Sequence, residues 1–184
     1  MPRRPTDDLD LRGLLVQIKV DPKYKKFARI VQRVSDRLDI EKDRTEALAL
    51  HASRSSRALH GGKRYSPKAL IDASLQDLHA RSRLVEIRVK ASNHIEVLDD
   101  GCDAIKHHLL TQYNQELRPF GTEAQRQALI KRVQRQALDL MVEGKSLLDM
   151  LDQIIKDIDQ ASYSLRATLD SLKLLDGAKA GRVV

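Results

Sequence analysis

Residues 130–175 read IKRVQRQALDLMVEGKSLLDMLDQIIKDIDQASYSLRATLDSLKLL. Small and apolar residues recur through this stretch at alternating steps of three and four, at Ile130, Val133, Ala137, Leu140, Gly144, Leu147, Leu151, Ile154, Ile158, Ala161, Leu165, Thr168, Leu172 and Leu175. All except Gly144 and Thr168 are Ala, Val, Ile or Leu. A stripe this narrow covers one seam of a helix and is buried only against another helix. The stretch therefore predicts a protein of long, mutually packed helices.

The composition agrees with a core made between helices. The 184 residues include two Phe, four Tyr and no Trp, so a large globular core would lack its usual bulky residues. The single cysteine, Cys102, excludes an internal disulfide and fits a reducing compartment. No apolar run approaches the roughly 18 residues of a membrane span, and no apolar segment follows the first arginines as in a secretory signal. We therefore expect a soluble, cytoplasmic protein without membrane contact.

Capping and turn signals divide the chain into four expected helices, over residues 7–20, 22–60, 67–117 and 122–175. Asp21-Pro22 and Ser66-Pro67 each place a capping residue before a proline, which favours a helix start. Thr122 with Gln125 fits a capping box, and Gly61-Gly62 and Gly177 are expected helix ends. The sequence thus predicts an all-α bundle of three to four long helices with coiled-coil-like packing.

We expect the protein to be a homo-oligomer, because the long C-terminal seam needs a partner over six heptads. The residues expected to form this oligomerisation seam are Leu140, Leu147, Leu151, Ile154, Ile158, Leu165 and Leu172.

Charge is concentrated in the first third of the chain. Residues 1–64 hold 16 Lys and Arg against 9 Asp and Glu, a surplus that equals the net charge of +7 of the whole chain. Charge gathered in one segment suggests a surface that faces a polyanion. We therefore expect a basic helical arm over residues 1–64, a bundle and oligomerisation region over 65–177 and a flexible tail over 178–184.

Basic side chains within this arm form the candidate nucleic-acid site. They are Lys26, Arg29, Arg33, Arg37, Arg54, Arg57, Lys63 and Arg64. Several cations spaced along one helix face suit phosphates, because each neutralised phosphate releases counterions. The alternative is a solvated or partner-binding face, since acidic residues are interleaved at Asp36, Asp39, Glu41 and Asp43.

Other patterns predict no catalytic or metal chemistry. The glycine turn at residues 60–64 lacks the spacing of a phosphate-binding loop, and no strand precedes it. Asp103 and His107 share a helix face, but a metal site needs more converging ligands. Cys102 lies on an apolar seam and is interpreted as a buried structural thiol. We expect a protein without enzymatic activity, metal or cofactor.

Two stretches resemble the UvsY family of phage recombination mediators. Residues 54–65, RSSRALHGGKRY, match the family's order of a basic helix ending at a glycine-and-lysine turn, and residues 147–179 match its leucine-rich closing helix. The chain departs from the family at Leu59-His60, where an aromatic pair is usual, and it carries an extra helical segment around residues 90–130. The resemblance implies a ring-forming protein that binds single-stranded DNA and helps a recombinase replace single-strand-binding protein, with DNA contacts at Arg54, Arg57, Lys63 and Arg64.

The leading hypothesis from the sequence is a non-enzymatic nucleic-acid-binding accessory protein, with single-stranded DNA or another nucleic acid as partner. The first alternative is a phage structural or assembly protein, such as a scaffold or a small terminase. The second is a coiled-coil adaptor whose basic helix binds an acidic protein. A pure scaffold would keep its self-assembly after deletion of residues 1–64 and would show no affinity for DNA.

Overall fold

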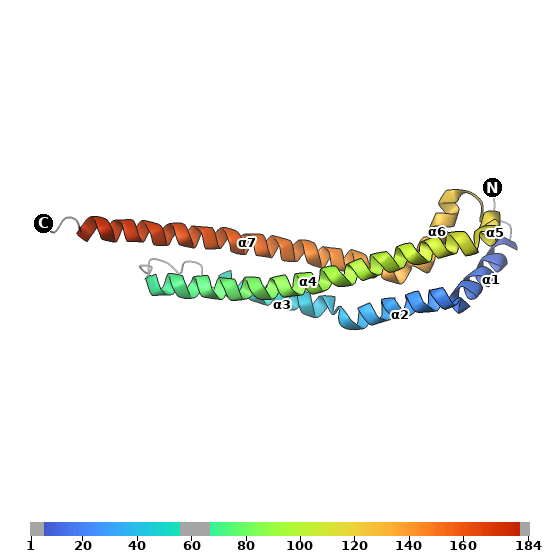
Figure 1. The fold of residues 1–184 in the computed structure, drawn as a ribbon, viewed down its shortest axis with the longest axis horizontal. Helices are drawn as coiled ribbons and strands as arrows, with labels where there is room; N and C mark the ends of the chain where they lie inside the picture. The colour runs from blue at the N-terminus through green and yellow to red at the C-terminus, as the bar shows by residue number, and fades with distance from the viewer. Residues whose placement is uncertain (1–5, 56–66, 181–184) are drawn as a thin grey trace. The chain divides into compact units, whose positions relative to one another are not determined.

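The fold, described by a computed structural model over residues 6–55 and 67–180, is all-α, as expected from the sequence. No strand occurs in these two ranges (Figure 1). In chain order the helices are α1 (Thr6–Val20), α2 (Pro22–Arg37), α3 (Ile40–Ser55), α4 (Pro67–Gln112), α5 (Asn114–Leu117), the 3-10 turn η1 (Arg118–Phe120), α6 (Glu123–Val133) and α7 (Arg135–Ala180).

The capping signals in the described ranges act as expected. The Asp21 carboxylate accepts hydrogen bonds from the backbone N–H groups of Lys23, at 2.7 Å, and Tyr24, at 3.3 Å, and Pro22 opens α2. The backbone N–H of Thr122 donates to the Gln125 side chain at 2.9 Å, which is the reciprocal half of a capping box. Local sequence therefore determines where these helices begin.

The expectation of one continuous helix from residue 22 to residue 60 is wrong. The helix stops at Arg37 and restarts at Ile40. Leu38 and Ile40 are both buried, at 3% and 7% exposure. Residues two apart point to nearly opposite sides of an α-helix, so one straight helix cannot bury both on the same face. The two-residue interruption allows each side chain to reach a core.

The C-terminal heptad is also interrupted, at Gln134 between α6 and α7. Gln134 is 5% exposed, and its amide donates a hydrogen bond to the backbone carbonyl of Cys102. Near this break the buried positions are Ile130, Gln134, Ala137 and Met141. Gln134 and Met141 thus take the buried places expected for Val133 and Leu140, which are half-buried. Helix α7 also continues to Ala180, three residues beyond Gly177, the glycine that was expected to end it.

Two compact units share the chain, and each combines segments that are distant in sequence. The first unit comprises Met1–Asp39 and Ala91–Ser146, and the second comprises Ile40–Lys90 and Leu147–Val184, within which the described ranges apply. Both long helices, α4 and α7, contribute to both units. The expected boundary between residues 64 and 65 lies outside the described residues.

In the first unit, α2 packs its apolar face on the second half of α4. The ring of Phe27 packs beside Gly101, where an added Cβ would lie 3.5 Å from the nearest ring atom, at ordinary van der Waals distance. Gly144 of α7 fits against Ile95, and a Cβ there would approach the Ile95 side chain to 2.9 Å. Gly144 therefore allows α7 to approach α4 closely at this point.

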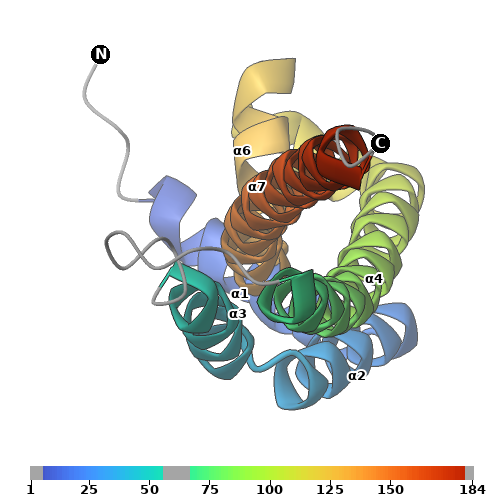
Figure 2. The same ribbon diagram turned by 90° about the vertical axis from the view of Figure 1, so that its left-hand side faces the viewer.

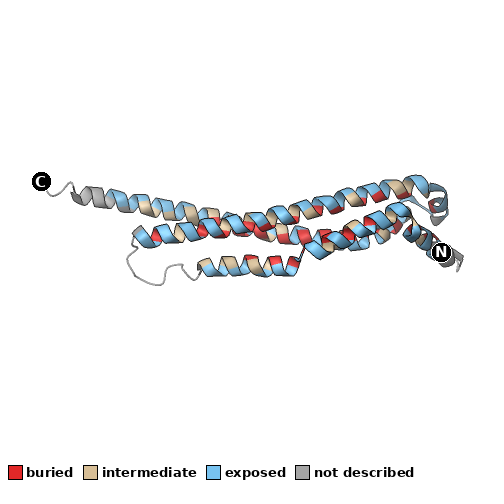
Figure 3. Ribbon diagram, turned by 60° about the horizontal axis from the view of Figure 1, so that its bottom comes forward, coloured by how far each residue is buried: buried red, intermediate tan, exposed pale blue. Residues whose placement is uncertain are grey.

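The second unit is a three-helix arrangement of α3, the first half of α4 and most of α7, which Figure 2 shows nearly end-on. Its buried apolar residues are Ile40, Ala47, Leu70, Ala80, Leu84, Ile87, Leu147, Leu151, Ile154 and Ile158. Buried positions follow one side of each long helix, and exposed positions follow the other (Figure 3). Within the described ranges, no helix combines the length and hydropathy that a membrane crossing requires.

Candidate nucleic-acid interface

Helix α2 is strongly amphipathic and strongly basic. Phe27, Val31 and Val34 form its buried face. Six of its 16 residues are Lys or Arg, and Asp36 is its one acidic residue. A helix with this pattern is anchored by one face and presents positive charge on the other.

The cations of α2 point away from the core. Four of the expected contacts, at steps of three and four, are all exposed: Lys26, Arg29, Arg33 and Arg37. Lys23 and Lys25 on the same helix are exposed as well, and the sequence reasoning did not include them. The signal that could have identified them was their place in the same capped helix, directly after Pro22. We call the set Lys23, Lys25, Lys26, Arg29, Arg33 and Arg37 the basic face of α2.

No side chain of the basic face forms an ion pair within residues 6–55 and 67–180. Asp36, the nearest candidate on α2, instead accepts a hydrogen bond from the Gln32 side chain at 2.7 Å. The positive charge of this face is therefore not neutralised locally.

The arginines of the second unit are in a different situation, because they bind carboxylates on neighbouring helices. Arg83 of α4 donates to Glu46 of α3 at 2.6 Å, which lowers the pKa of that carboxyl. Arg81 of α4 donates to Asp159 of α7 at 2.7 Å. The pairs Arg88–Asp152 and Lys90–Asp43 follow the same scheme. Each of these four cations pairs with a carboxylate on a neighbouring helix, while 42% to 50% of its side chain stays exposed.

The structure therefore separates the expected site residues. Arg54 lies in the second unit, where its guanidinium donates to Asp77 at 2.7 Å, with 10% of its side chain and 7% of that of Asp77 exposed. A guanidinium so enclosed is not presented to a phosphate. Arg57, Lys63 and Arg64 lie outside the described residues. The expected cations that the structure brings together on one exposed face are those of α2.

A part-buried polar cluster lies at the start of α2. The Asp21 carboxylate, besides capping α2, contacts the His108 ring and accepts a hydrogen bond from the Tyr113 hydroxyl, both at 3.0 Å. Burial would raise the pKa of Asp21, but the hydrogen bonds from His108, Lys23, Tyr113 and Tyr24 outweigh it and lower the pKa to about 2. The cluster ties the α1–α2 junction to the end of α4, so it positions the first turn of the basic face.

The expected oligomerisation seam is largely used within the chain. Four of its seven residues are buried inside the second unit, at 0% to 5% exposure: Leu147, Leu151, Ile154 and Ile158. Leu140 and Leu165 are partly exposed, and the side chain of Leu172 lies outside the described residues. Helix α7 thus meets α3 and α4 of its own chain along most of this seam.

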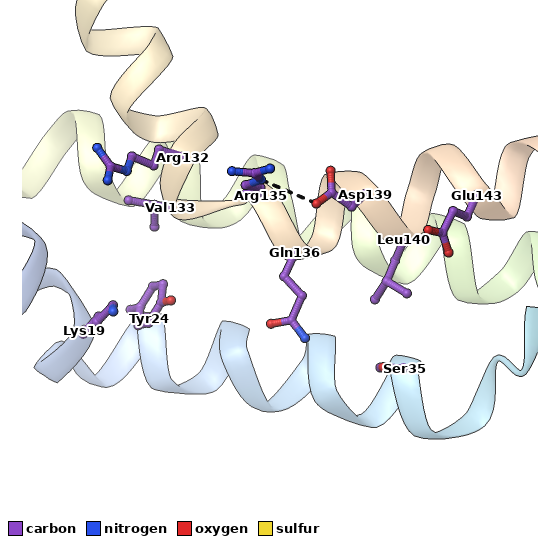
Figure 4. Close-up of a pocket in the computed structure, with 10 residues that line it drawn as sticks. All are labelled: Lys19, Tyr24, Ser35, Arg132, Val133, Arg135, Gln136, Asp139, Leu140 and Glu143. Atoms are coloured by element: carbon purple, nitrogen blue, oxygen red, sulfur yellow. Dashed lines mark ion pairs between the residues drawn. The ribbon is translucent and has the colours of Figure 1, made fainter.

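A groove of about 490 Å³ in the first unit explains why two seam positions are only half-buried. Val133 and Leu140 line it, together with polar side chains from α1, α2, α6 and α7 (Figure 4). Arg135 and Asp139 pair across one turn of its wall at 3.7 Å. The groove is lined by three cations, Lys19, Arg132 and Arg135, and by two carboxylates, Asp139 and Glu143, so its charge is mixed and it does not form a strong anion site.

The described residues contain no group of three or more His, Cys, Asp or Glu placed to hold a metal ion. Burial, with Asp99 and Asp103 nearby, raises the pKa of the Cys102 thiol to about 11. A thiol with that pKa stays protonated near neutral pH and is a poor nucleophile.

No family model, curated protein or solved structure matches the chain.

Proposed function

We propose that the protein is a non-enzymatic accessory protein that binds the phosphate backbone of nucleic acid through the basic face of α2. The observation that carries this proposal is the contrast between the units. The cations of α2 are exposed and without ion pairs among the described residues, whereas the arginines of the second unit bind carboxylates on neighbouring helices.

Single-stranded DNA is the proposed ligand, and loading of a recombinase is the proposed biological role. The resemblance of residues 54–65 and 147–179 to the UvsY family supports this role. A homo-oligomer in the cytoplasm fits the same role, and the free, buried thiol of Cys102 is in keeping with a reducing compartment.

The direct test measures fluorescence anisotropy of a labelled single strand at low and moderate salt. If four phosphates are neutralised, affinity should fall about 50-fold between 50 and 200 mM salt, since each contact contributes roughly 0.7 to the logarithmic salt dependence. Absence of binding at the lower salt concentration would contradict the proposal.

Charge reversal then locates the site. The variant K26E/R29E/R33E/R37E should lose binding, because it inverts the basic face while leaving the buried face of α2 unchanged. A matched control, K106E/R118E/K131E/K145E, makes the same change in net charge at exposed positions elsewhere in the first unit. Equal loss in both variants would show that only the overall charge matters.

A second variant tests the turn that the resemblance implicates. R57E/K63E/R64E should weaken binding if the turn also contacts DNA. Arg54 is left out of this variant, because reversing its charge would place two carboxylates together in a buried pair. Duplex DNA, RNA and an acidic peptide in the same assay distinguish the polyanions. Preference for the peptide would favour the adaptor.

A further inference from the structure

Helix α4 carries a second heptad stripe, on a side other than its buried seam. The stripe lies within the second unit and comprises Ile71, Leu75, Leu78, Ser82, Val85 and Val89. Its steps alternate four and three over 19 residues. Ile71, Leu75, Leu78 and Val89 are 48% to 62% exposed. Single exposed apolar residues are ordinary, but a regular row at coiled-coil spacing is not.

The two seams of α4 are distinct in position. Its buried seam in this unit runs through Leu70, Ala80, Leu84 and Ile87, all at most 5% exposed. At 100° per residue, the exposed stripe lies about 155° around the helix from this seam. The chain's own helices cover the buried seam and leave the stripe open. A helix with two apolar seams packs against partners on both sides.

The charges that flank the stripe indicate what covers it. Arg81 and Arg88 lie along one edge, and Asp72, His79 and Glu86 lie along the other, with Lys90 farther round the helix. Glu86 also pairs with Arg83 of the same helix at 3.0 Å and keeps 63% of its side chain exposed. In a parallel, in-register pair of α4 helices, Arg81 of one copy faces Glu86 of the other. In an antiparallel pair, the edge with the two arginines would face the same edge of the other copy. The edge with Asp72 and Glu86 would likewise face its own counterpart. The charges therefore fit a second copy of the same helix in parallel.

The arginines remain able to take part in such a contact. Arg81 and Arg88 also pair with Asp159 and Asp152 of α7, and each keeps 43% of its side chain exposed. A guanidinium has five donors, so it can bind two carboxylates.

We infer that two copies of this chain associate through the exposed stripe of α4, parallel and in register. This interface differs from the α7 seam, most of which the chain buries internally. The inference does not depend on nucleic-acid binding, because the basic face belongs to the first unit. The stripe is shorter than three heptads, so association is expected at about micromolar concentration, as for small interfaces.

Sedimentation velocity over roughly 1 to 100 µM tests the association, a range chosen to bracket a weak interface. The intact chain should pass from monomer to dimer, and L75K/L78K should stay monomeric, with at least a tenfold weaker association. The control L48K changes a comparably exposed leucine, at 49%, on α3 of the same unit. A wild type that stays monomeric, or an L75K/L78K variant that dimerises like the wild type, would overturn the inference. Circular dichroism verifies that each variant is folded.

Disulfide trapping tests the orientation. Ser82 faces its own counterpart only in a parallel, in-register pair, so S82C should give a covalent dimer under mild copper-catalysed oxidation by air. Q76C, exposed and off the stripe, is the matched control, and the wild type is the blank because its only thiol is buried. Equal cross-linking of S82C and Q76C would contradict the parallel arrangement.

Discussion

Arg33 and Arg54 have the same side chain in opposite surroundings. Arg33 lies exposed on α2 and has no ion pair among the described residues. Arg54 lies enclosed against Asp77. An exposed guanidinium can exchange counterions for phosphates, whereas an enclosed one stabilises the fold by matching a buried carboxylate. Composition counts both residues as +1, and only their neighbours distinguish the two roles.

Arg54→Ala should destabilise the second unit by about 1 to 3 kcal/mol, because it removes the guanidinium that matches a carboxylate with only 7% of its side chain exposed. Urea unfolding followed by circular dichroism measures this change. The double variant R54A/D77A should recover part of the loss. The comparison variant R83A breaks a more exposed pair and should have a much smaller effect. Similar losses in R54A and R83A would refute the assigned role of burial.

At the scale of the helix, two glycines that read alike in the sequence have different roles. A Cβ on Gly13 of α1 would meet no atom within 4 Å, whereas a Cβ on Gly144 of α7 would press on Ile95. Ile95 is itself buried, so it has little room to move. The sequence placed Gly144 on the seam, but its neighbours came from the structure.

Gly13→Ala should therefore stabilise the protein by roughly 0.5 to 1 kcal/mol, the usual gain inside a helix. At Gly144 the added Cβ would crowd the Ile95 side chain. This overpacking should cancel the gain in stability, so Gly144→Ala should be neutral or destabilising. Thermal unfolding of the two variants side by side measures the difference. A higher midpoint for Gly144→Ala than for Gly13→Ala would contradict the packing of α7 against α4.

Asp21, at the junction of α1 and α2, should make the free energy of unfolding depend on pH in the acid range. The pKa of Asp21 is about 2 in the folded chain, against an ordinary value of 3.8. Its stabilisation is thus fully present above about pH 4 and is lost as the pH falls through 2. Asp21→Asn keeps a capping residue and removes the charge, so it should cost about 2 kcal/mol at neutral pH. Urea titrations at pH 6, 4 and 2.5 should show this difference shrinking, and a constant difference would disprove the linkage.

The same elements show the limits of reading helices from spacing. The capped starts at Asp21 and Thr122 could be predicted, because capping is local chemistry. The interruptions at Leu38 and Gln134 could not. The interruption at Leu38 allows both Leu38 and Ile40 to be buried. At the other break, the Gln134 side chain donates a hydrogen bond to the backbone carbonyl of Cys102, 32 residues away. Both causes are contacts between distant segments.

At the scale of the molecule, the first 39 residues complete a core and are not a separable arm. Phe27, Val31 and Val34 are buried in the unit that Ala91–Ser146 completes. Deleting residues 1–39 should therefore expose the apolar side of α4 and α6, raise binding of a hydrophobic dye and lower helicity beyond the share of the deleted residues. Circular dichroism and dye fluorescence measure both effects. Unchanged ellipticity per remaining residue, without dye binding, would show that the remainder folds independently.

The sequence by itself determined the all-α class, the capped helix starts and the apolar seam of α7 from Leu147 to Ile158, because periodicity and capping depend only on nearby residues. The tertiary structure decided which cations stay exposed on α2 and which bind carboxylates in the second unit. It also decided that α7 is buried mainly within its own chain while a stripe of α4 stays open. These outcomes depend on which distant segments meet, and a one-dimensional spacing contains no information about that choice.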